Sequence, residues 1–179
     1  MIVASEISES VLDDETSSGS TCKFIDLENG YGLKCYKECY YKNYETAYTV
    51  QKYMAERNAA PKVGESIKIG DYYCYVTEVI EVMSEYGHDN DYAENKEDLD
   101  DDDSRYQDMQ EAEDLFAESN EWGYDYLDDH TGNYGYLANG TCVVIDFDIC
   151  MSLYHDIIKC YGYPDGLLRR DVDDQIDED

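Results

Sequence analysis

The acidic residues of this chain far outnumber its basic residues, and this imbalance limits what the chain can fold into and bind. There are 43 Asp and Glu against 13 Lys and Arg, which gives a formal net charge of −30 at pH 7. Such a surface repels nucleic acid and anionic membranes, because both are bound mainly through Lys and Arg. We therefore expect no direct binding to nucleic acid or membranes, and we expect partners to be basic, neutral or assisted by a cation, with a basic protein as one candidate.

A chain with this charge still needs apolar surface for a core, and tyrosine supplies it. Tyr occurs 20 times, compared with three Phe and one Trp. Disordered chains are poor in aromatic residues, and a tyrosine ring can be buried while its hydroxyl finds a polar partner. The composition therefore predicts a folded protein, and its 179 residues suit one domain or two small lobes that share a cleft.

Seven cysteines occur at irregular spacings, without a CxxC pair. The first residues do not read as a secretory signal peptide, so we expect reduced thiols in the core rather than a disulfide framework. With only three His, a structural zinc site is disfavoured as well. No apolar run approaches the roughly 20 residues of a membrane-spanning helix. These features predict a cytoplasmic protein, intracellular in the host if the source is viral.

The first half of the chain predicts strands around one helix. Two short apolar runs, residues 22–27 and 31–36, flank Asn29-Gly30, and this dipeptide is typical of a tight hairpin turn. Apolar residues at helical spacing over residues 44–60 predict an amphipathic helix that ends before Pro61. The apolar runs at 67–69 and 72–82 predict two further strands.

The second half begins with a dense run of acidic residues. Residues 84–105 are dominated by Asp, Glu and Asn, which repel one another and favour a solvated loop or a disordered insertion. A helix is predicted over residues 107–121, followed by a polar loop, an apolar strand at 142–145 and a short helix near 152–159. Another acidic stretch follows Arg170.

Three polar residues in the second half could act together. Asp128 and Asn133 lie in the polar loop, and Asp146 comes directly after the apolar strand. Carboxylate and amide oxygens suit Mg²⁺, which retains waters and binds substrate phosphates. The alternative is an ordinary turn followed by a strand end, since Asp and Asn are common turn residues.

The two segments that hold these residues, LDDHTGN and VVIDFD, resemble the catalytic and metal-binding loops of the protein-kinase-like superfamily. The resemblance is to its aminoglycoside phosphotransferase type and other atypical branches. It implies that Asp128 orients the attacking hydroxyl and accepts its proton. It also implies that Asn133 and Asp146 hold the Mg²⁺ that bridges the phosphates of ATP.

The same resemblance assigns nucleotide-binding roles in the first half. It implies that Gly19 belongs to a phosphate-binding hairpin and that Lys34 reaches the α- and β-phosphates, with Lys37 or Lys42 as alternatives if the register differs. Glu45 is the implied partner of Lys34, in competition with Glu56. Glu78 falls in the hinge that reads the adenine.

The sequence also departs from that family. Gly19 is the one glycine in the core of the phosphate loop, and Tyr126 stands where the family usually has His. The triplet that opens with Asp146 ends in Asp148 rather than Gly. The chain after it is too short for the usual helical platform that docks peptides.

We therefore expect an α+β, minimal two-lobed protein-kinase-like fold with an antiparallel sheet in the N-lobe and a truncated helical C-lobe. Its parts would be an N-lobe (1–82), an acidic linker (83–106) and a reduced C-lobe (107–179). The leading functional prediction is an ATP- and Mg²⁺-dependent phosphotransferase for an unidentified hydroxyl. The alternative is a catalytically silent acidic protein, or nucleic-acid mimic, that inhibits a basic partner.

Overall fold

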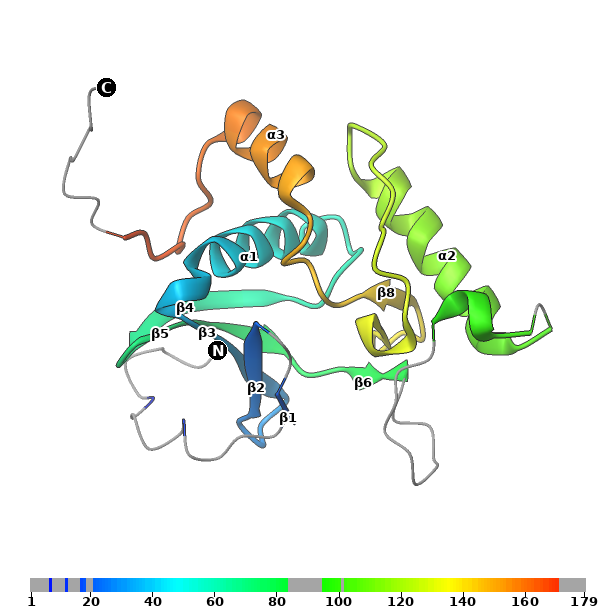
Figure 1. Ribbon diagram of the computed structural model, residues 1–179, viewed down its shortest axis with the longest axis horizontal. Coiled ribbons are helices and arrows are strands. Elements are labelled where there is room, and N and C mark those ends of the chain that lie inside the picture. The colour runs from blue at the N-terminus through cyan, green and yellow to red at the C-terminus, as the bar shows by residue number, and fades with distance from the viewer. Residues whose placement is uncertain are drawn as a thin grey trace.

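The structure, a computed structural model, describes residues 7, 12, 17–18, 21–83, 95–100 and 102–170. It is an α+β fold with a larger and a smaller antiparallel sheet and three α-helices (Figure 1). The expected α+β class and antiparallel first sheet are confirmed. Gly19, half of the acidic linker and the acidic stretch after Arg170 lie outside the described residues.

The larger sheet has the strand order β1-β2-β3-β5-β4. Its strands are β1 (Ser17–Ser18), β2 (Cys22–Asp26), β3 (Tyr31–Lys37), β4 (Val63–Ile69) and β5 (Tyr72–Glu78). The predicted hairpin is confirmed, because β2 pairs antiparallel with β3 across the turn that contains Gly30. Gly30 has a φ of +83°, a conformation that residues with a side chain rarely adopt.

Helix α1 (Tyr41–Ala55) connects β3 to β4 and lies across one face of the larger sheet (Figure 1). It begins earlier than predicted, directly after a 3-10 turn at Glu38–Tyr40. Its buried face includes four tyrosines, of which Tyr44 and Tyr48 are fully buried against Tyr75 of β5. Tyrosine thus supplies the core between helix and sheet.

The apolar run at 72–82 was predicted as one strand, but the structure divides it. β5 ends at Glu78, and the next strand, β6 (Glu81–Val82), belongs to the smaller sheet. That sheet has the order β6-β7-β8, with β7 (Tyr134–Tyr136) and β8 (Cys142–Val144). The chain therefore passes from one sheet to the other over two residues, 79–80.

Helices α2 (Ser104–Ser119) and α3 (Met151–Tyr161) complete the fold. α2 packs on β8 and α3 packs on α1. α2 begins before the predicted 107, because the Asp103 carboxylate accepts a hydrogen bond from the Arg105 backbone N–H at 2.9 Å and caps the helix. A 3-10 turn at Lys96–Asp98 precedes it, so part of the predicted acidic loop is ordered.

Buried side chains form two clusters on opposite faces of the larger sheet. The larger cluster contains residues of α1, α2 and α3, so the two predicted lobes share one core. The smaller cluster consists of Ile25, Leu33, Cys35, Ile69, Cys74 and Val76. Along β3 the side chains alternate, and Lys34 and Tyr36 face the α1 side.

The expectation that all cysteines are reduced is wrong for two of them. Cys35 and Cys74 are directly opposite each other on β3 and β5, with 4.1 Å between their Cα atoms, and they form a disulfide. The spacing of the cysteines along the sequence does not predict this pairing, because the register of β3 against β5 brings the two residues together. In the described part of the chain no helix combines the length and apolar character needed to cross a bilayer.

The disulfide can be tested by counting thiols. Unfolding the protein under non-reducing conditions with excess iodoacetamide is expected to add five carbamidomethyl groups by mass spectrometry, since the other cysteines are Cys22, Cys39, Cys142, Cys150 and Cys160. Reduction before alkylation is the control and is expected to give seven. Seven groups without reduction would contradict the disulfide.

Candidate functional site

The Lys34 side chain reaches from β3 of the larger sheet to the segment that follows β8 of the smaller one. Its ammonium group donates a hydrogen bond to the Ile145 carbonyl at 2.6 Å and lies 3.6 Å from Asp146 Oδ1. The Lys34 side chain is only 12% exposed. Two residues that the sequence proposed for one site, Lys34 and Asp146, are therefore in contact.

The groups around Lys34 keep its ammonium group protonated. Burial acts to lower the pKa of this ammonium group, but Tyr75, Asp146 and other acidic groups outweigh that effect and raise the pKa above its ordinary value of 10.5. Lys34 is therefore positively charged at any physiological pH. It is a fixed cation within a very acidic protein, in a position to attract an anionic ligand.

The polar loop before β7 is held in one conformation by Asn133. Asn133 is 4% exposed and lies in a 3-10 turn at Thr131–Asn133. Its side-chain amide donates to the Asp128 carbonyl at 2.8 Å, and its backbone N–H donates to the His130 carbonyl at 2.9 Å. The Asp128 carboxylate, 44% exposed, is left facing outward, with His130 Nε2 3.8 Å from its Oδ1.

Ile145 links this loop to Lys34. Its backbone N–H donates to the Asn133 carbonyl at 2.9 Å, while its own carbonyl accepts the hydrogen bond from Lys34. A continuous path of hydrogen bonds therefore runs from Lys34 through Ile145 and Asn133 to the backbone of Asp128. All four predicted residues Lys34, Asp128, Asn133 and Asp146 belong to this connected group.

Tyr126 adds a second link between the two loops. Its ring is buried, and its hydroxyl donates to the Asp146 carbonyl at 2.9 Å. In the sequence, Tyr126 stood out only as a departure from the family that the two motifs resemble. In the structure it fixes the backbone of Asp146, a role that the sequence pattern did not reveal.

Asp148 lies beside Asp146 and carries an unfavourable charge. Its carboxylate accepts a hydrogen bond from the Thr21 hydroxyl at 2.5 Å, and Asn43 of α1 is a further hydrogen-bond partner. Burial, followed by repulsion from Asp146, nevertheless raises the pKa of Asp148 above its usual 3.8. Two neighbouring carboxylates therefore face the region around Lys34.

Glu45 is not the partner of Lys34, and this prediction needs correction. Glu45 is 3% exposed on α1, where it pairs with Lys42 at 3.2 Å and accepts a hydrogen bond from Tyr154. A helical Glu finds its neighbour at i−3 on its own helix, and the packing of α3 supplies Tyr154. Among the described residues, the ion pair of Lys34 is formed with Asp146 instead.

The other residues predicted to bind nucleotide are Lys37, Lys42, Glu78 and Gly19. Lys37 and Lys42 are exposed, so Lys34 is the lysine that faces the site. Glu78 lies at the end of β5 next to the connection between the sheets, but its backbone N–H donates to the Lys62 carbonyl and its carboxylate accepts from the Lys62 N–H. Those groups are therefore engaged within the protein. Gly19 lies outside the described residues.

Asn133 and Asp146 carry the types of oxygen that Mg²⁺ binds in proteins, where phosphate and water usually complete its coordination. Asp146 Oδ1 is buried and accepts no hydrogen bond from the described residues, although Lys34 lies near it. Asn133 and Asp146 are joined through neighbouring backbone groups, and both types of oxygen suit Mg²⁺. The described residues contain no cluster of three or more His, Cys, Asp or Glu side chains able to hold a metal alone.

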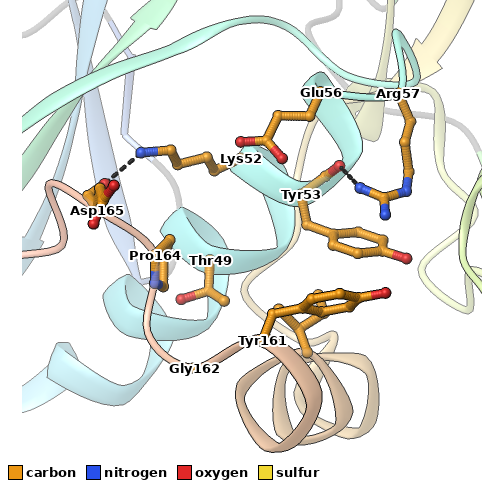
Figure 2. Close-up of a pocket in the computed structure, with 10 residues that line it drawn as sticks. Thr49, Lys52, Tyr53, Glu56, Arg57, Tyr161, Gly162, Pro164 and Asp165 are labelled. Carbon is orange, nitrogen blue, oxygen red and sulfur yellow. Dashed lines mark hydrogen bonds between the residues drawn. The ribbon is translucent and has the colours of Figure 1, made fainter.

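Lys34 and Asp146 do not line either of two hollows in the described surface. One has a volume of about 330 Å³ and lies between α1 and α3, where Lys52, Tyr53, Arg57 and Tyr161 line it (Figure 2). Arg57 donates to the Tyr53 carbonyl and lies over the Tyr53 ring, 3.5 Å from the ring centroid, so its guanidinium is already occupied. The other hollow adjoins Cys150 and is described below.

Comparison with known proteins gives this chain no relative. No protein-family model matches it, and no curated protein matches it.

The burial of the Asp148 carboxylate and its repulsion from Asp146 predict a pH-dependent gain in stability for Asp148→Asn. The substitution removes one charge and keeps an oxygen for the Thr21 hydroxyl. Because the pKa of Asp148 is raised by folding, the wild-type protein loses stability as the pH rises from about 4 toward neutrality. The variant is expected to have the larger free energy of unfolding at pH 7, and the difference is expected to shrink toward pH 4.

Urea titrations at several pH values measure this difference. The exposed residue Asp102 provides the matched control, since Asp102→Asn removes the same charge at the surface. Equal stability of wild type and Asp148→Asn at pH 7, or a difference that grows on acidification, would contradict the assignment.

Proposed function

We propose that this protein is a kinase-like phosphotransferase that uses ATP and Mg²⁺ to phosphorylate a hydroxyl group. The observation that carries the proposal is the contact of buried Lys34 with Asp146 and Ile145, because Ile145 also binds the loop of Asp128 and Asn133. A cation, two possible metal ligands and an exposed carboxylate are thereby connected. Phosphoryl transfer needs these groups, since its catalysis consists of positioning and charge stabilisation.

The order of the elements supports the same proposal. A β-hairpin leads to the strand that carries Lys34, a helix follows, and two more strands complete an antiparallel sheet. A short connection then leads to the part that holds Asp128 and Asp146. This is the order in which the resemblance to kinases arranges the nucleotide-binding and catalytic segments.

Each residue has a distinct role in the proposed reaction. Lys34 attracts the α- and β-phosphates, and Asp128 orients the acceptor hydroxyl and accepts its proton. Asn133 and Asp146 hold the metal, which when bound neutralises the charge of the phosphates. Tyr126 keeps Asp146 in place through its carbonyl. Glu45 has no part in this mechanism.

Magnesium would also relieve the repulsion at the site. Burial, followed by repulsion from the Asp146 carboxylate, raises the pKa of Asp148. A divalent cation at Asp146 lowers this repulsion. Nucleotide and metal are therefore expected to bind together rather than independently.

The second candidate is an acidic binding protein that inhibits a basic partner without catalysis. The observation that favours it is the charge distribution, because the sequence has no Lys or Arg from Tyr106 to Ile158. Such a surface can occupy the nucleic-acid-binding face of a basic protein. Binding of the partner without any turnover of ATP would distinguish this function from phosphotransfer.

An intracellular, cytoplasmic location accompanies the proposed use of ATP. The Cys35–Cys74 disulfide is the observation that stands against a reducing compartment, where such bonds are uncommon. The bond is buried on both strands, which limits the access of a reductant.

Thermal unfolding tests the nucleotide site. With Mg²⁺-ATP at about 100 times its Kd, the wild-type protein should gain about 2.7 kcal/mol of stability. Lys34→Met is expected to lose most of this gain, because the substitution removes the cation. Lys37→Met, at an exposed position of the same strand, is the matched control and should behave as wild type. Absence of a shift in the wild type would contradict the proposal.

Transfer of the γ-phosphoryl group tests the catalytic residue. With labelled ATP, Mg²⁺ and a mixture of protein and small-molecule hydroxyl acceptors, Asp128→Asn is expected to lower the rate by at least about 100-fold. Its Mg²⁺-ATP thermal shift should be retained. Asp102→Asn changes an exposed carboxylate outside this loop and is the control. Equal rates for Asp128→Asn and wild type would overturn the role of Asp128.

A further inference from the structure

An exposed apolar patch adjoins the candidate site. Leu127, Ile149 and Met151 are 82%, 48% and 37% exposed, and together they line a hollow of about 110 Å³. Leu127 directly precedes Asp128, and Ile149 follows Asp148. Large apolar side chains that gather around one hollow commonly mark an interaction surface.

The walls and floor of this hollow are held in place. Phe116 of α2 and Leu153 of α3 are each 2% exposed and form its buried base. Tyr124 on the rim is fixed at both ends, because its backbone N–H donates to the Asn120 side chain at 2.8 Å and its hydroxyl donates to Asp156 at 2.7 Å. The hollow therefore exists before any partner binds.

The surroundings of the hollow are strongly acidic. Asp125 lines it, and Asp128 and Asp129 follow on the same loop. Cys150, another lining residue, has its pKa raised to about 12 by burial and then by the carboxylates of Asp146, Asp148 and Asp128. The sequence around the hollow has no Lys or Arg to balance these charges, from Tyr106 to Ile158.

We infer that this surface docks a basic polypeptide segment, with one large apolar side chain of that segment in the hollow lined by Leu127 and Ile149. Charge complementarity selects this occupant. A second copy of the chain would bring its own −30 charge against the same carboxylates. Nucleic acids and anionic lipids are repelled for the same reason.

The size of the hollow agrees with a side chain as its occupant. Pockets for small organic ligands usually measure about 300 Å³ or more, whereas this one measures about 110 Å³. A single apolar side chain can enter it while Lys or Arg residues on either side meet Asp125 and Asp129. Apolar contact then provides the anchor, and charge guides the approach.

This docking does not depend on phosphotransfer. A basic segment can bind with or without ATP, so a failure of the nucleotide experiments leaves the inference standing. If phosphotransfer occurs, the neighbouring position of Leu127 and Asp128 means that a docked segment brings its hydroxyl groups to the catalytic carboxylate. The acceptor of the phosphoryl group would then be a basic protein.

Fluorescence anisotropy with two labelled peptides tests the inference without nucleotide. One peptide has ten residues of Lys and Gly with a central Leu, and the other has Ser in place of that Leu. The full-length wild-type protein is expected to bind the Leu peptide about ten-fold more tightly, which is the order expected for burial of one such side chain. Salt is expected to weaken the binding of both peptides.

Substitutions at the patch separate the apolar and ionic contributions. The double variant Leu127→Ser with Ile149→Ser is expected to bind the two peptides with affinities within two-fold of each other. Asp125→Asn with Asp129→Asn should instead weaken both peptides by a similar factor. Tyr40→Ser, which changes another exposed large side chain, is the matched control and should keep the ten-fold preference. Circular dichroism melting verifies that each variant is folded.

Three outcomes would overturn the inference. The first is equal binding of the Leu and Ser peptides by the wild type. The second is an unchanged preference in the Leu127→Ser and Ile149→Ser variant while its fold is intact. The third is a concentration-dependent dimer in light scattering that this variant abolishes, because the patch would then be covered by a second copy of the chain.

Discussion

The buried ammonium group of Lys34 connects the two sheets of this molecule. It extends from the middle of β3 to the backbone and side chain that follow β8. Removal of the lysine would leave the Ile145 carbonyl without this donor and would leave Asp146 beside Asp148 without a counter-charge. Removing one partner of a buried ion pair usually lowers the stability of a protein by more than the pair contributes, because the other charge stays buried without its partner. The relative position of the two sheets at the site therefore depends on this contact.

The rest of the fold shows how a chain of charge −30 can build a core. Tyrosine rings fill the space between α1 and the larger sheet, and some of their hydroxyl groups bind polar partners inside the protein. Tyr75, for example, donates to Gln51 Oε1 at 2.8 Å, and the Gln51 amide donates to Thr77 at 2.8 Å. A buried network of this kind is stabilising when its members are satisfied. Tyrosine rings thus bury apolar area at core positions that Phe or Leu would fill in many other proteins.

Local signals in the sequence predicted the elements well, and contacts between distant segments could not be predicted from them. The Asn29-Gly30 turn and the helical spacing before Pro61 report on short stretches of chain, so both elements appear in the structure. The partner of Glu45 depends on how α1 and α3 pack, and the Cys35–Cys74 bond depends on strand register. The spacing of residues along the sequence predicts neither contact. The grouping of Lys34, Asp128, Asn133 and Asp146 was predicted from the family resemblance. The role of Tyr126 depends on a contact with the Asp146 carbonyl, 20 residues along the chain, which no local pattern predicts.

The Cys35–Cys74 bond has a further meaning because of its position next to Lys34. Side chains alternate between the two faces of a strand, so a slip of β3 by one residue would turn Lys34 to the opposite face of the sheet. A covalent bond between directly opposed residues of β3 and β5 forbids that slip. The disulfide therefore acts as a register lock, and it fixes which side of the sheet presents the lysine to the other half of the molecule.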